Sequence, residues 1–464
     1  MPSWFHAQDL TIARLLLQRG LGVVYLIAFT VVLDQFRPLL GERGLLPVPR
    51  FLERMRFRDS PSLFHFRYSD RLVSALAVAG MLLSLAVVLG VPDRWPAPLV
   101  TALWLVLWAL YLSFVNVGQI FYSFGWESLL LEAGFLAAFL GPAWTAPPVT
   151  IVWLFRWLLF RLEFGAGLIK LRGDSCWRDL TCLDYHHETQ PMPNPLSWFF
   201  HRLPRPLHRV EVLGSHFAQV VAPVFLFFPQ PLAASAGGIM AVTQFWLVLS
   251  GNFSWLNLTA IVLTASAFDD EQLRHVHAAL PASGFTDVSA LVVTALVLAL
   301  SWKPLLNLVS RHQKMNASFD PLHLVNTYGA FGSVSRERYE VAVEGTSDGM
   351  EWIEYSFRGK PADPKRNPRQ WAPYHLRLDW LMWFAAISPS YAAPWFVPFV
   401  RKLLENDKAT LRLLGPNPFA AEPPLAVRAT LYRYRFSSIR ERRETGAVWV
   451  RTKVEEFLPP LFRR

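Results

Sequence analysis

Cysteine is nearly absent from this chain of 464 residues, which contains only Cys176 and Cys182. A zinc site built on repeated C-x-x-C pairs is therefore excluded. Both cysteines lie in one short polar loop. They either form a local disulfide, which requires that the loop face an oxidising compartment, or they are small buried apolar side chains. The residues alone leave both interpretations open.

Several motifs that carry chemistry are also missing. The sequence has no G-x-x-x-x-G-K-[ST] and no G-x-S-x-G, so nucleotide hydrolysis and α/β-hydrolase chemistry have no support. His186, His187 and Glu188 form a cluster without H-E-x-x-H spacing, and adjacent histidines point in different directions. We therefore predict no metal and no cofactor. An internal repeat, which would favour a transporter, is absent as well.

The net charge is +10, but the basic residues are not concentrated on one face of a soluble domain. The basic residues are spread over many loops that flank apolar segments, where Lys and Arg normally contact lipid headgroups. A nucleic-acid surface would need these charges on one face of a soluble domain. We therefore predict no nucleic-acid partner.

Apolar residues make up 53% of the chain and are strongly segregated. Up to residue 310, long apolar runs alternate with basic loops, and after residue 311 the pattern is that of a soluble domain. The sequence predicts an α-helical polytopic membrane bundle of about eight or nine spans over residues 1–310, followed by a small β-rich soluble domain with two helices over residues 311–464. The expected spans are 21–33 with its preceding residues, 72–91, 99–120, 121–142, 149–171, 212–228, 232–250, 253–268 and 288–308.

The soluble part shows strand and turn signals. Residues 336–357 alternate apolar and polar side chains on either side of Asp348-Gly349, which predicts a β-hairpin. Further strands are expected near residues 427–438 and 447–457. Residues 376–387 and 395–407 read as amphipathic helices.

The expected span over residues 149–171 carries several charges, and each charge at bilayer depth costs about 2.5–3.5 kcal/mol unless it has a partner or a purpose. Glu163 and Lys170 lie two helical turns apart on one face, with Gly165 and Gly167 between them. Either they line a polar cavity in which Lys170 acts as a base, or Lys170 is an interfacial anchor.

The remaining charges of these two spans invite a structural interpretation. Glu127 and Glu132 lie on the preceding span, and Arg156 and Arg161 lie on the span of Lys170. Ion pairs between the two helices would satisfy all four side chains. We expect Glu127 and Glu132 to pair with Arg156 and Arg161.

Long blocks of the sequence resemble the lipase maturation factor family. They are FYSFGWESLLLEAGFLAAFL, the whole stretch 153–204, LVLSGNFSWLN, VNTYGAFGSVSRERYEVAVEG and YHLRLDWLMWFAA, with GERGLLP nearer the N-terminus. The resemblance implies a polytopic membrane protein that helps secreted lipase-like clients to fold, with the C-terminal domain outside the cytosol. It implies the endoplasmic reticulum membrane, or the cytoplasmic (inner) membrane if the source is bacterial.

On this hypothesis, the client contacts apolar or strand-edge surface of the tail, with Asn326, Tyr328 and Phe331 as candidate residues. The segment from Trp380 to Phe384 is a further candidate, although core packing is the simpler interpretation of its aromatic residues. The orientation is contested, because basic loops after the first and fifth spans predict a cytoplasmic tail. A disulfide at Cys176–Cys182 requires the opposite.

A more distant resemblance supplies the rival hypothesis. The membrane part, and FGAGLIKL in particular, is similar to the membrane region of vitamin K-dependent γ-carboxylases, in which a lysine in a comparable setting is the catalytic base. Lys170 occupies that position, and Glu163 lies on the same helix face. The rival is a membrane enzyme that acts on a lipid or quinone-like substrate, although the sequence favours a folding factor without catalytic chemistry.

Overall fold

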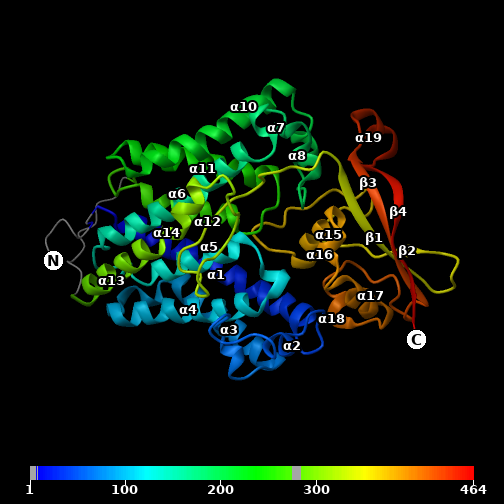
Figure 1. Ribbon diagram of the computed structural model, residues 1–464, viewed down its shortest axis with the longest axis horizontal. Helices are drawn as coiled ribbons and strands as arrows, with labels where there is room; N and C mark the ends of the chain where they lie inside the picture. Colours follow the sequence, from blue (N-terminus) through cyan, green and yellow to red (C-terminus); the bar gives the residue numbers. More distant parts are fainter. Residues whose placement is uncertain (1–6, 8, 274–283, 464) are drawn as a thin grey trace.

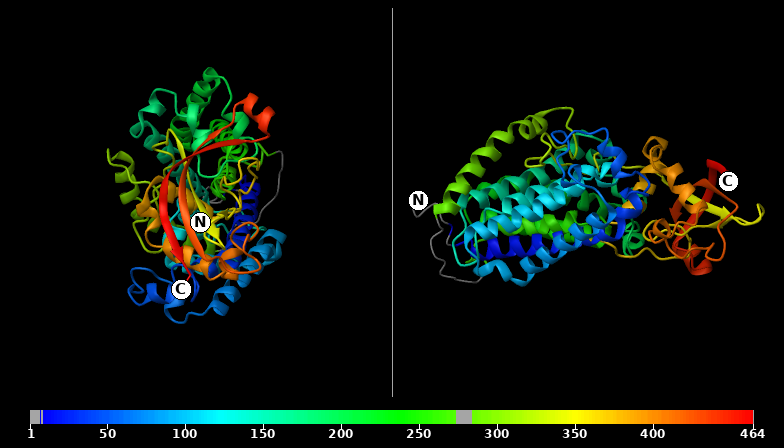
Figure 2. Two further views of the ribbon diagram at one scale, coloured as in Figure 1. Left: turned by 90° about the vertical axis from the view of Figure 1, so that its right-hand side faces the viewer. Right: turned by 90° about the horizontal axis from the view of Figure 1, so that it is seen from below.

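The computed structural model is elongated, with a helical body at one end and a small sheet at the other (Figure 1). It describes residues 7, 9–273 and 284–463. The long helices run roughly along the longest axis, and the sheet caps one end of the bundle (Figure 2). The long apolar runs of the sequence thus form the helical body, and the segments that alternate apolar and polar residues form the sheet.

Six helical segments among the described residues are long and apolar enough to cross a membrane. Many of their apolar side chains are exposed on the outside of the body, as expected for helices that face lipid. The six segments are α1 (Thr11–Leu40), α3 (Asp70–Leu89), α4 (Ala97–Val117), Arg205–Phe227, α11 (Leu232–Ser250) and Gly284–Val309.

Three further apolar helices fill the interior: α5 (Gly125–Ala137), α6 (Val149–Arg172) and α12 (Leu256–Thr264). Every residue of α5 is buried, and α6 is long enough to span but carries five charged side chains. The predicted polytopic helical bundle is confirmed. The expected count of eight or nine spans corresponds to the six long segments together with these inner helices.

Two of the six segments are composite. Arg205–Phe227 consists of α10 (Arg205–His216), the π-helical η5 (Phe217–Val221) and the 3₁₀-helical η6 (Ala222–Phe227). Gly284–Val309 consists of α13 (Gly284–Leu300) and α14 (Trp302–Val309). Short elements of the body are α2 (Val48–Leu52), η2 (Leu63–His65), η3 (Val91–Arg94), η4 (Gln119–Tyr122), α7 (Ser175–Arg178), α8 (Leu183–Thr189), α9 (Ser197–Phe200) and η7 (Ala265–Ala267).

The soluble domain contains a four-stranded antiparallel sheet with the order β2-β1-β3-β4. The strands are β1 (Arg338–Thr346), β2 (Ile353–Glu354), β3 (Ala426–Phe436) and β4 (Trp449–Phe462). The predicted hairpin is confirmed as β1–β2, and Gly349 in its turn has a φ of +81°, a conformation that favours glycine. The two further predicted strands are β3 and β4.

The two predicted helices of this domain are α15 (Arg377–Ile387) and α17 (Phe396–Leu404), and the short α16 (Pro389–Ala392), α18 (Lys408–Leu411) and α19 (Ile439–Thr445) accompany them. One continuous hydrophobic core runs from the membrane helices into this domain, from Leu17 on α1 to Phe399 on α17. The soluble domain is therefore packed onto the helical body.

Candidate functional site

A buried ion pair joins the soluble domain to the helical body. Arg377, the first residue of α15, donates from Nη1 to Glu127 Oε1 on α5 at 2.7 Å and to the carbonyl oxygen of Phe121 at 2.7 Å. Both charged side chains are fully buried. Tyr111 donates to the second oxygen of the carboxylate. Charge-assisted hydrogen bonds of this kind are among the strongest in proteins, so this contact fixes α15 to the body.

Gln35 on α1 reinforces the same junction. Its Nε2 donates to the carbonyl oxygen of His375 at 2.6 Å, and its Oε1 accepts from the backbone N–H of Arg377 at 3.0 Å. Tyr374 donates to Asp34 at 2.9 Å. The C-terminal end of α1 and the segment 374–377 thus share a set of direct hydrogen bonds, and the soluble domain lies at that end of the bundle.

A second buried network fixes the segment that precedes the sheet. Glu132 on α5 forms an ion pair with Arg161 on α6. The same carboxylate accepts from the Asn326 backbone N–H at 3.0 Å and from the Tyr328 hydroxyl at 2.7 Å. Arg161 also donates to the carbonyl oxygen of Asn326 at 2.6 Å. Residues 326–328 therefore belong to the interior of the body.

This placement corrects the expected client surface. Asn326 and Tyr328 are buried and satisfy Glu132, so their side chains cannot contact a client. Phe331 is half-buried and packs against Phe253 and His186. In the other candidate segment, Trp380 is buried in the core. The polar and aromatic residues near 326 serve the junction because a buried carboxylate needs several donors.

Arg156 differs from the expectation that it pairs with Glu127 or Glu132. Its Nε donates to the carbonyl oxygen of Ser266 at 2.7 Å, and its Nη1 donates to that of Leu226 at 3.2 Å. These carbonyls lie in the 3₁₀ elements η7 and η6, at ends of helices where carbonyl groups lack intrahelical partners. Arg156 thus satisfies helix ends, and Glu127 pairs with Arg377 instead.

Glu163 and Lys170 lie in one buried polar cluster but are joined through a third residue. Lys170 Nζ donates to Gln219 Oε1 at 2.9 Å, and Gln219 Nε2 donates to Glu163 Oε2 at 3.4 Å. Gln244 donates to the other oxygen of Glu163 at 2.6 Å, and Lys170 Nζ lies 4.6 Å from the centre of the Trp177 ring. Gln219 belongs to the π-helical η5. The cluster ties α6 to η5 and α11.

The two glycines between Glu163 and Lys170 have neighbours from the protein itself. A Cβ at Gly165 would collide with the carbonyl oxygen of Tyr328, and a Cβ at Gly167 would lie 2.6 Å from Val220 Cγ2. A little further along, Gly173 faces the carbonyl oxygen of Gly332 in the same way. The close approach that the glycines predicted is made by the linker and by η5.

A double-mutant cycle tests whether the Glu163–Lys170 cluster is structural. We expect Lys170→Met to lower the free energy of unfolding by about 1–3 kcal/mol, because Glu163 and Gln219 lose a charged partner in a buried site. Adding Glu163→Gln should recover most of that loss. Thermal unfolding in detergent measures both. A Lys170→Met protein that is as stable as the parent but inactive would assign Lys170 a chemical role.

The loop between α6 and α10 forms a compact cap. Cys176 and Cys182 are joined in a disulfide, and both are buried. The Asp174 carboxylate accepts from the Cys176 backbone N–H and from both terminal nitrogens of Arg336, at 2.7 and 2.8 Å. These hydrogen bonds, with Arg336 first, lower the pKa of Asp174 to about 2. The cap is therefore tied to the segment that leads into β1.

The histidines of the cap have separate partners. His186 packs edge-on against Phe331, and His187 Nε2 lies 3.9 Å from Glu211 Oε2. Glu188 accepts from the backbone N–H of Phe436 on β3 at 2.6 Å. Among the described residues, no group of three His, Cys, Asp or Glu side chains converges on a common point. Glu188 thus links the cap to the sheet.

A groove of about 430 Å³ opens between the cap, the start of β1 and α15. One wall is apolar and comes from α15, where Ile387 is 48% exposed. The opposite wall is polar. The lining residues are Thr189, Ser335, Arg336, Glu337, Arg338, Tyr339, Trp383, Ala386 and Ile387.

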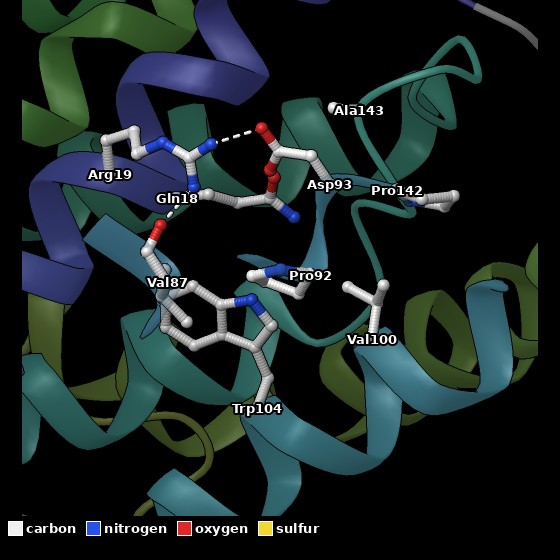
Figure 3. Close-up of a pocket in the computed structure, with 9 residues that line it drawn as sticks. All are labelled: Gln18, Arg19, Val87, Pro92, Asp93, Val100, Trp104, Pro142 and Ala143. Atoms are coloured by element: carbon white, nitrogen blue, oxygen red, sulfur yellow. Dashed lines mark hydrogen bonds and ion pairs between the residues drawn. The ribbon is translucent and has the colours of Figure 1, made fainter. Parts of the chain in front are cut away.

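A much smaller cavity lies in the half of the body farther from the sheet (Figure 3). Arg19 on α1 pairs there with Asp93 on η3 and donates to the carbonyl oxygen of Val87, while Trp104 and Pro142 line other sides. Its volume of about 10 Å³ is enough for one water molecule at most. This cavity is therefore too small for a substrate.

Two family models match the chain. The lipase maturation factor transmembrane domain matches residues 12–275, and the lipase maturation factor C-terminal domain matches residues 324–459. The chain belongs to the lipase maturation factor family. The first matched region covers the helical body up to residue 275, before α13 and α14, and the second covers most of the linker and the soluble domain.

Curated relatives extend over nearly the whole chain. Lipase maturation factor 1 of Bos taurus is 40% identical over all of this chain and 91% of its own length. Lipase maturation factor 1 of Homo sapiens is 42% identical over 99% of this chain and 89% of its own length, and human lipase maturation factor 2 is 29% identical over 96% and 82%. No solved structure matches this lipase maturation factor chain.

The most important residues of the site that sequence reasoning missed are Arg377 and Gln35. Arg377 stands in a mostly apolar run, HLRLDWLMWFAA, whose other charged residue is Asp379, and an arginine in such a run signals a buried partner. Its partner, Glu127, lies 250 positions away, and nothing in the local pattern identifies it. Gln219 and Gln244 gave no signal, since single glutamines in apolar helices fit many roles.

Proposed function

We propose that this protein is a membrane-embedded folding factor that assists the maturation of a secreted, lipase-like client. Membership of the lipase maturation factor family supports the proposal, and so do the names of its relatives. The observation that carries it is the pair of buried networks at Glu127 and Glu132. These two networks attach the soluble domain and its linker to the helical body, and so hold the domain at the membrane surface.

The groove beside α15 is the client contact that best fits this role. It lies on the soluble domain next to the cap, and its exposed Ile387 and the partly exposed Trp383 offer apolar surface to a chain that has not finished folding. A partly folded client exposes apolar segments, and their burial in such a groove would be favourable by about 25 cal/mol per Å².

Co-expression with a secreted lipase tests the proposal. Cells that lack the protein should release lipase with a lower activity per molecule, and the intact chain should restore it. A photo-crosslinking residue at position 387 should capture the newly made lipase, whereas one at Ile439, which is exposed on α19 outside the groove, should not. Lipase of unchanged specific activity from deficient cells would refute the proposal.

We propose further that the soluble domain faces the oxidising side of the membrane, which is the lumen of the endoplasmic reticulum or, in a bacterium, the periplasm. The Cys176–Cys182 disulfide of the neighbouring cap supports this orientation. An N-glycosylation acceptor inserted at the hairpin turn near Gly349 should be modified when the chain is made in eukaryotic microsomes. An unmodified chain that is correctly inserted would place the domain in the cytosol.

A further inference from the structure

The segment between α1 and α3 presents aromatic and basic side chains outward from a rigid support. Phe57, Leu63 and Phe66 are 49%, 41% and 78% exposed and lie within ten residues of one another outside the spanning helices. The rings of Phe57 and Phe66 lie 5.6 Å apart. Leu63 and Phe66 are three positions apart at the 3₁₀-helical η2, a spacing that places side chains on the same side.

Hydrogen bonds and a buried aromatic side chain fix this segment against α4. Ser60 and Ser62 donate to the carbonyl oxygens of Asn116 and Ser113 near the end of α4, at 2.7 and 2.9 Å. Phe64 is buried and its ring lies 5.3 Å from that of Phe114. The buried positions alternate with the exposed ones, so the segment holds its apolar side chains away from the protein.

Arginines flank the exposed phenylalanines in the sequence, and one of them, Arg56, forms an exposed ion pair with Asp59 at 2.8 Å. Residues 41–69 contain six arginines and three carboxylates, and Arg54, Arg56 and Arg67 are exposed beside the phenylalanines. The described connections between helices at the other end of the body carry one arginine and four carboxylates, Arg94 with Asp93 and 269–271. Among the described connections at the far end carboxylates are therefore in excess, whereas arginines are in excess in residues 41–69 at the end that carries the soluble domain.

The position of this segment between two spanning helices determines its environment. Both ends of the segment continue directly into helices that are long and apolar enough to span the bilayer, α1 and α3. The segment therefore lies at the level of the lipid headgroups, where aromatic rings favour the interface and guanidinium groups bind phosphate. Figure 1 shows it at the junction of the body and the soluble domain, at the end of α1, which contacts α18.

We propose that Arg54, Arg56, Phe57, Leu63, Phe66 and Arg67, here called the arginine–phenylalanine patch, bind the headgroup region of the bilayer and prefer anionic phospholipids. The rings enter the boundary of the acyl chains, and the arginines hold lipid phosphates. The patch also accounts for the conflict over orientation. Its arginines serve as headgroup ligands on the side of the soluble domain, so they do not mark the cytoplasmic side.

Site-directed labelling tests the depth of the patch. Because both native cysteines are in a disulfide, Phe66→Cys and Ile439→Cys each supply one free thiol for a nitroxide in lipid nanodiscs. We expect the label at position 66 to be several-fold more accessible to oxygen than to a water-soluble nickel reagent, relative to the label at 439. Equal accessibility at both positions would overturn the proposal.

The lipid preference is tested by mutation of the arginines. Nanodiscs of phosphatidylcholine with phosphatidylglycerol should raise the melting temperature of the intact chain above that in phosphatidylcholine alone. Arg54→Gln/Arg56→Gln/Arg67→Gln should lose that increase, since each arginine at an anionic surface contributes about fivefold in affinity. The control Arg440→Gln/Arg443→Gln, on exposed positions of α19, should keep it. An unchanged increase in the triple variant would refute the preference.

Discussion

Arg377→Met is expected to lower the free energy of unfolding by about 3–5 kcal/mol, because it leaves the carboxylate of Glu127 buried without its cation. The neighbours that remain are Tyr111, which donates a neutral hydrogen bond, and His375, whose Nδ1 lies 3.8 Å from Glu127 Oε1, and neither replaces the guanidinium. Because Arg377 begins α15, the loss should also loosen the soluble domain. Thermal unfolding in detergent measures the first effect, and limited proteolysis between body and domain measures the second.

Two control variants define what the result means. Glu127→Gln/Arg377→Met removes both charges and should be clearly more stable than Arg377→Met alone, since the cost comes from the uncompensated carboxylate. Arg440→Met removes an exposed arginine of α19 and should change stability by less than about 0.5 kcal/mol. If Arg377→Met behaved like Arg440→Met, the buried pair would not hold the domain.

Glu132→Leu should be as damaging, with a loss of about 3–5 kcal/mol. The carboxylate is the shared acceptor for Arg161, Asn326 and Tyr328, and leucine would leave a buried guanidinium without its counter-charge. The segment 326–332 should then separate from α6, and hydrogen exchange of its amides should become faster while exchange in β3 stays slow.

Glu132→Gln removes the negative charge at this site but keeps the size of the side chain and one acceptor oxygen. The amide oxygen can still accept from Asn326 or Tyr328, so the packing of the linker should survive better than in the leucine variant, while the ion pair with Arg161 is lost. The expected order of stability is parent, then Gln, then Leu. A leucine variant as stable as the glutamine variant would mean that the hydrogen bonds of the linker contribute little.

Local patterns in the sequence predicted the fold well. Hydrophobic length predicted the helical bundle, and Asp348-Gly349 predicted the hairpin, because both signals act within one element. The charges at membrane depth predicted that buried partners exist. Neighbouring helices led to Arg156 and Arg161 as joint candidates for Glu127 and Glu132, and the structure contains one of these pairs, Glu132 with Arg161.

The rest depends on contacts between distant parts of the chain. Arg377 binds Glu127, which lies 250 positions away in the sequence. Residues 326–328 look like a surface loop in the sequence, but Tyr328 packs against Gly165 in the interior. Glycines in an apolar helix predict a close neighbour but do not identify it. For that reason, the sequence could not show that the neighbours of Gly165 and Gly167 are Tyr328 of the linker and Val220 of η5, or that Lys170 donates to Gln219.

The separation of Glu127 from Arg377 also constrains how this protein is made. Chains grow at about 5–20 residues per second, so about 10–50 s pass between synthesis of the carboxylate on α5 and synthesis of its cation. During that interval the helical body holds an acidic group that nothing yet neutralises, and its final packing waits for the last third of the polypeptide. Chains that end before residue 377 should therefore be targets of membrane quality control even though every spanning helix is complete.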